Sequence, residues 1–117
     1  MKVMEIYDYL DSIAPFEKAM SRDNCGLLVG GFDSDIKRAI VVLDVTNEII
    51  SEAAAKAAQL IISHHPVIYT PMNSFTDSSP AFRAAQNNIS IICAHTNLDI
   101  APGGVNDILI RTLGIKK

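Results

Sequence analysis

The three histidines of this 117-residue chain are the residues whose type and spacing best suit metal chemistry. Two are adjacent in Ser63-His64-His65-Pro66, and the third opens the segment His95-Thr96-Asn97-Leu98-Asp99. Neutral imidazole and carboxylate groups suit zinc, iron, manganese or nickel. The pair His64 and His65 is therefore interpreted as metal ligands rather than as structural histidines.

The roles of His95 and Asp99 stay open on the residues alone. His95 is a metal ligand, a group that orients Asp99, or a hydrogen-bonded core histidine, and the last two interpretations are preferred. Asp99 either binds metal or begins the turn at Pro102-Gly103.

The adjacency of His64 and His65 is informative in itself. Successive side chains of an extended chain point to opposite sides, and Pro66 favours the extended region for His65. The pair therefore predicts two separate tasks, such as ligation of two different metals. Two metals about 3.5–4 Å apart would lower the pKa of a shared water and produce a hydroxide nucleophile near neutral pH.

Alternating strands and helices are expected to position these residues. Buried apolar runs predict strands, and the segments between them read as helices. This alternation predicts an α/β fold with two right-handed crossovers and a mostly parallel sheet that carries helices on both faces. The expected strands cover 27–29, 39–43, 60–62 and 89–94, and the expected helices cover 3–13, 48–59, 80–87 and 105–113.

Polar side chains follow the three central strands at the point where each one ends. Asp44 follows the first, His64 and His65 the second, and His95 the third, with Asp99 beyond it. Ligands of such sheets bind outside the carboxyl ends of the strands, so this convergence predicts a site. Asp44 is nevertheless interpreted as the cap of the next helix.

The composition indicates one globular domain over residues 1–117. Hydrophobic residues make up 49% and charged residues 20%, and the net charge of −3 provides no footprint for nucleic acid. We find no apolar run of about 18 residues and no signal-peptide core, so the expectation is a cytoplasmic protein without a membrane span. Cys25 and Cys93 are interpreted as small buried residues rather than as ligands or nucleophiles.

Three motifs together resemble those of the NIF-three-like family, also described as GTP cyclohydrolase I type 2 homologues and as dinuclear-metal hexameric proteins. They are Asp23-Asn24-Cys25-Gly26-Leu27-Leu28-Val29-Gly30, Leu60-Ile61-Ile62-Ser63-His64-His65-Pro66 and His95-Thr96-Asn97-Leu98-Asp99. The resemblance implies that His64, His65 and Asp99 are metal ligands and that His95 lies near the site. It also implies an α/β fold and a ring-shaped hexamer whose metal sites face an internal cavity.

The sequence departs from the family pattern in two ways. Arg22 stands where family members often have tryptophan, and the His-x-x-x-Glu motif of the family's second half is absent. The chain is therefore expected to correspond to the N-terminal half, with a site that is short of ligands. Two functions follow as expectations: metal-activated hydrolysis of a nucleotide or phosphoester, or a non-catalytic metal-binding or assembly module. The chain is expected to form a homo-oligomer or to need a partner chain that carries the missing half.

Overall fold

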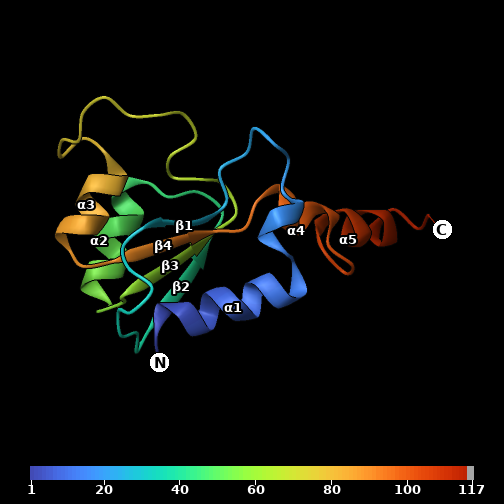
Figure 1. Ribbon diagram of the computed structural model, residues 1–117, viewed down its shortest axis with the longest axis horizontal. Helices are drawn as coiled ribbons and strands as arrows, with labels where there is room; N and C mark the ends of the chain where they lie inside the picture. The colour runs from blue at the N-terminus through green and yellow to red at the C-terminus, as the bar shows by residue number, and fades with distance from the viewer. Residues whose placement is uncertain (116–117) are drawn as a thin grey trace.

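The computed structural model describes residues 1–115, and their strands form one sheet in the order β1-β4-β3-β2 (Figure 1). Strands β2, β3 and β4 are mutually parallel, and β1 pairs antiparallel with β4. The elements in chain order are α1 (Val3–Ile13), the 3-10 helix η1 (Phe16–Lys18), β1 (Gly26–Val29), β2 (Ala39–Val42), α2 (Asn47–Ala55), β3 (Leu60–Ser63), α3 (Pro80–Gln86), β4 (Ser90–Cys93), α4 (Thr96–Ile100) and α5 (Val105–Thr112). The predicted α/β class with a mostly parallel sheet is confirmed.

Helices cover both faces of the sheet because successive strand residues point to opposite sides. On one face Ile61 and Ile91 pack in a buried cluster with Ile50 of α2 and Ala84 of α3. On the other face Leu60 and Ile92 are clustered with Val3 of α1. Figure 1 shows α2 and α3 together on one side of the sheet and α1 along the other. Strands β3 and β4 are buried on both faces, which explains their unbroken apolar runs. The same expectation is wrong for β2, where exposed and half-buried residues alternate and Val41 is 78% exposed, because β2 is the edge strand of the sheet.

Helix α2 ends at Ala55, earlier than the predicted end at Gln59. Ala57 adopts a left-handed backbone conformation with φ of 54°, which stops the helix and turns the chain into β3. The alanine-rich composition gave no sign of this because alanine is a strong helix former. Tertiary packing of the neighbouring Ala58, which is 5% exposed, accompanies the early turn.

Helix α5 projects from the body of the protein toward the C-terminus (Figure 1). None of its residues is buried. Within the described residues 1–115, we find no helix with the length and apolar character needed to cross a membrane.

Removal of core volume beneath α2 should destabilise the protein strongly. Ile61 is fully buried, and an Ile61→Ala substitution is expected to lower the free energy of unfolding by about 2–5 kcal/mol because it leaves a cavity. Met4 is 49% exposed on α1, and Met4→Ala is expected to change it by less than about 0.5 kcal/mol. Urea unfolding of the two variants and the parent protein measures both values, and equal effects would contradict this packing.

Candidate metal centre

The three imidazoles meet at the carboxyl edge of the parallel strands. His64 and His65 follow β3 directly, and His95 precedes α4 just after β4. Strands β3 and β4 are in register, with Ser63 opposite Cys93, so the residues after them emerge side by side. The ring centroids lie 5.0–5.6 Å apart. One nitrogen from each ring lies within 4.8 Å of the other two.

The expected divergence of His64 and His65 is wrong. Their ring centroids are 5.4 Å apart and both rings reach the same cluster. The strand ends at Ser63, and the Ser63 hydroxyl donates a hydrogen bond of 2.9 Å to the carbonyl oxygen of His65. The chain therefore bends at this point and loses the alternation of an extended strand.

Asp99 lies where the sequence placed it, beside the histidines. Its Oδ1 is 3.4 Å from Nε2 of His64. It sits on α4, a short helix not expected from the sequence, and its backbone N–H donates to the carbonyl oxygen of His95. The single turn of helix thus brings Asp99 back toward the strand ends.

Each imidazole is held through its Nδ1 atom. Nδ1 of His64 is 2.8 Å from the carbonyl oxygen of Ala94, and Nδ1 of His65 is 2.6 Å from Oδ1 of Asp44. Nδ1 of His95 is 3.0 and 3.1 Å from the two carboxylate oxygens of Asp23. These oxygens accept hydrogen bonds, so in a neutral ring Nδ1 carries the proton and the lone pair lies on Nε2.

The interpretation of Asp44 as a helix cap is wrong. Thr46 caps α2, because its hydroxyl accepts a hydrogen bond from the N–H of Ile49 at 3.2 Å. Asp44 contacts His65 instead. Its carboxylate therefore belongs with the polar groups around the cluster, as its place at the end of β2 first suggested.

Asp23 also belongs to the site, although its residue type and spacing alone give it no role there. Its side chain is only 3% exposed, and besides His95 it accepts hydrogen bonds from the N–H and hydroxyl of Thr96 at 3.1 and 2.6 Å. Burial alone would raise the pKa of Asp23, but the hydrogen bonds from His95 and Thr96 outweigh it and hold the pKa well below its usual value. The only available signal was the place of Asp23 in a motif of the resembled family.

The donor set and its spacing fit a divalent cation. Zinc lies about 2.0–2.1 Å from imidazole nitrogen and at a similar distance from carboxylate oxygen, so two ligands of a tetrahedral ion are about 3.3 Å apart. The 3.4 Å between Nε2 of His64 and Oδ1 of Asp99 matches this value. One nitrogen of each ring lies within 4.8 Å of the other two, which is wider than this spacing.

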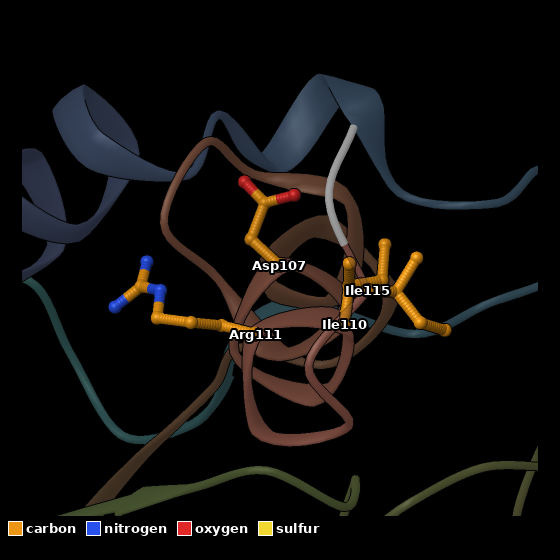
Figure 2. A pocket seen from close by; sticks show the side chains of 4 residues that line it. All are labelled: Asp107, Ile110, Arg111 and Ile115. Atoms are coloured by element: carbon orange, nitrogen blue, oxygen red, sulfur yellow. The ribbon is translucent and has the colours of Figure 1, made fainter.

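The site is open to solvent, since the side chains of His64 and His65 are 22% and 46% exposed. A pocket of about 290 Å³ is lined by Asp107, Ile110, Arg111 and Ile115, on and just beyond α5. Figure 2 shows these side chains around it, and no candidate ligand is among them. This pocket is therefore separate from the histidine cluster.

Comparison with known proteins identifies the family of this chain. The model of the family Duf34/NIF3 (NGG1p interacting factor 3) matches residues 1–117. The chain belongs to this family. This agrees with the resemblance seen in the three motifs.

Similar members of the Duf34/NIF3 family include bacterial proteins named GTP cyclohydrolase 1 type 2 homolog. The protein from Staphylococcus aureus strain MRSA252 is 38% identical over an alignment of 119 positions, which covers 99% of this chain and 32% of that protein. The protein from Listeria innocua is 38% identical over an alignment of 123 positions, which covers 99% of this chain and 33% of that protein. The chain thus spans about a third of the length of these relatives.

Solved structures of similar proteins share the fold. A crystal structure of a hypothetical protein of Staphylococcus aureus has a TM-score of 0.91 and 38% identity, and the match covers all of this chain and 40% of that one. Reduced HcgD from Methanocaldococcus jannaschii has a TM-score of 0.93 and 32% identity, with 48% of its chain covered. The fold of this chain therefore corresponds to 40–48% of these two larger structures.

The thiols beside the cluster are expected to be unreactive in the folded protein. Burial raises the pKa of the Cys93 thiol to about 12, and the neighbouring Cys25 and Asp23 add to the shift. Because the thiolate is the nucleophile, little of it exists at about pH 8. Iodoacetamide should label Cys93 only after unfolding in urea, as followed by mass spectrometry of peptides. Rapid labelling of Cys93 in the native protein would contradict its buried environment.

Proposed function

We propose that this chain binds a divalent metal ion through Nε2 of His64, Nε2 of His65 and the carboxylate of Asp99. His95 is an additional donor through its own Nε2. The observation that carries the proposal is the anchoring of all three rings at Nδ1, which leaves their Nε2 lone pairs available. Zinc, iron, manganese and nickel all suit these donors.

The proposed activity is metal-dependent hydrolysis of a nucleotide or a phosphoester. A divalent cation supplies Lewis acidity and makes a hydroxide nucleophile available near neutral pH. The names of the relatives as GTP cyclohydrolase 1 type 2 homologs favour a nucleotide among substrates. The chain's own contribution is to hold and orient the imidazoles, through Asp44 for His65 and Asp23 for His95. The half-open setting of His64, which is 22% exposed, leaves room for substrate and water.

A second candidate is a metal-binding or assembly module that has no activity alone. It is favoured by the coverage of only about a third of the relatives. The family resemblance implies that the rest of such proteins carries a His-x-x-x-Glu motif with further ligands. Hydrolysis of nucleotides and model phosphoesters, with and without a chelator, separates the two functions. Turnover that is lost with the chelator and in His64→Ala, His65→Ala supports the hydrolase, and metal binding without turnover supports the module.

A metal titration tests the site itself. Calorimetry with zinc or manganese should show one weak, water-rich site, because the proposed donors cannot saturate two ions. The double variant His64→Ala, His65→Ala should lose about 100-fold or more in affinity. Asp35→Asn is the control, because Asp35 precedes β2 and pairs with Lys2 away from the carboxyl edge of the sheet. The zinc affinity of this variant should equal that of the unmodified chain. Two tight sites in the unmodified chain would contradict the proposal that the ligand set is incomplete.

We also propose that the apolar face of α5 is covered in an assembly, either a homo-oligomer such as the family's hexamer or a complex with a chain that carries the missing half. This face is formed by Val105, Ile108, Leu109 and Leu113, which are 38–65% exposed. Exposed contiguous apolar surface of this kind promotes association. The cytoplasmic location expected from the sequence stays a prediction.

Association through α5 should depend on concentration. Sedimentation across a concentration series is expected to show oligomers, and Leu109→Lys should shift them toward monomer because it places a charge on the apolar face. Met4→Lys, at a residue 49% exposed on α1, is the matched control and should leave the distribution unchanged. A strict monomer that binds no dye specific for apolar surface would show that the chain closes its own core.

A further inference from the structure

The carboxylate of Asp23 lies directly behind His95 and is shielded from solvent. Oδ1 of Asp23 is 3.0 Å from Nδ1 of His95, and the side chain is 3% exposed. Oδ2 accepts from the Thr96 hydroxyl at 2.6 Å and from the Cys25 thiol at 3.2 Å. The backbone N–H of Asn24 donates to Oδ1 at 2.9 Å. A carboxylate with this many donors has little freedom to rotate.

The direction of the bond to His95 follows from the chemistry of its acceptor. Three fixed donors point at the oxygens of Asp23, namely the backbone N–H groups of Asn24 and Thr96 and the Thr96 hydroxyl, and this is the environment of an ionised carboxylate. An ionised carboxylate only accepts, so Nδ1 of His95 donates the proton and Nε2 keeps its lone pair. The carboxylate therefore selects the tautomer of His95 and holds the plane of its ring.

The other two histidines have acceptors that are either exposed or uncharged. The partner of His65 is Asp44, whose side chain is 60% exposed, so water competes for that contact. The partner of His64 is a backbone carbonyl oxygen, which carries no full charge. Asp23 thus gives His95 an orienting group that is both charged and shielded.

The same carboxylate also links the cluster to the segment that follows α1. The Thr96 hydroxyl that donates to Asp23 accepts a hydrogen bond from the N–H of Met20 at 2.9 Å. Nearby, the fully buried Asn97 donates to the carbonyl oxygen of Ala14 at 2.8 Å. The position of His95 therefore depends on contacts with residues more than 70 positions earlier in the chain, of which the bond to Asp23, 72 positions away, is the charged one.

We infer that Asp23 is the positioning residue of the metal centre, which selects the Nδ1–H tautomer of His95 and aims its Nε2 at the metal. This inference rests on the proposed metal-binding function for its consequence, but the tautomer itself exists without metal. Loss of an orienting partner of this kind commonly lowers metal affinity by about 10- to 100-fold.

The test begins with the unmodified, metal-free protein. Proton–nitrogen correlation spectra of the imidazoles at about pH 8, where model imidazole is neutral, distinguish Nδ1–H from Nε2–H in each ring. The expected result is Nδ1–H for His95. An Nε2–H tautomer of His95 in the unmodified protein overturns the inference, whether or not any variant folds.

Two variants then separate positioning from stability. Asp23→Asn replaces the charged acceptor by a group that also donates, and it should mix the His95 tautomers and lower zinc affinity by about 10- to 100-fold. Thr96→Val removes the hydroxyl contact of Asp23 but leaves the bond between Asp23 and His95. It should lower the melting temperature while the His95 tautomer and its Nδ1–H signal stay unchanged.

The outcomes also separate this inference from the proposed function. Asp23→Asn with an unchanged His95 tautomer and unchanged zinc affinity overturns the positioning role, even if zinc binds well to the unmodified protein. A tautomer that changes in Asp23→Asn, in a protein that binds no zinc, supports the role of Asp23 and contradicts only the metal centre.

Discussion

The in-register parallel pairing of β2, β3 and β4 is the constraint on which the rest of the site depends. Ser63 lies opposite Val42 on one side and opposite Cys93 on the other, so three strands end at the same level. Asp44, His64 and His95 follow these ends within two residues. The apolar contacts that bury both faces of the sheet thus also determine how close the polar groups come.

A cluster of three imidazoles is useful to a metal only if the correct nitrogen of each ring faces inward. An oxygen acceptor near Nδ1 of each histidine holds the ring so that its Nε2 keeps the lone pair. Those acceptors come from separate parts of the chain, namely Ala94 after β4, Asp44 after β2 and Asp23 before β1. Orientation of the imidazoles is therefore a property of the whole fold, although the histidines themselves occupy two short motifs.

The sequence predicted the parts of the fold that depend on local pattern. Apolar runs located the strands, and their alternation with helices predicted the parallel sheet and the edge at which His64, His65 and Asp99 lie together. Other features depend on contacts that no local pattern contains. The contact of Asp23 with His95 joins residues 72 positions apart, and that of Asp44 with His65 joins residues 21 positions apart. The rings of His64 and His65 converge at a bend after β3, where the Ser63 hydroxyl donates to the carbonyl oxygen of His65. Helix α2 ends early because Ala57 takes a left-handed conformation.

The central claim is that imidazoles of this chain bind a divalent metal directly. X-ray absorption spectroscopy of the protein loaded with one equivalent of zinc tests it most directly, because it reports the atoms bound to the ion. The account predicts two or three imidazole nitrogens at about 2.0–2.1 Å, with the remaining ligands oxygen. A spectrum with oxygen ligands alone and no imidazole scattering would contradict it.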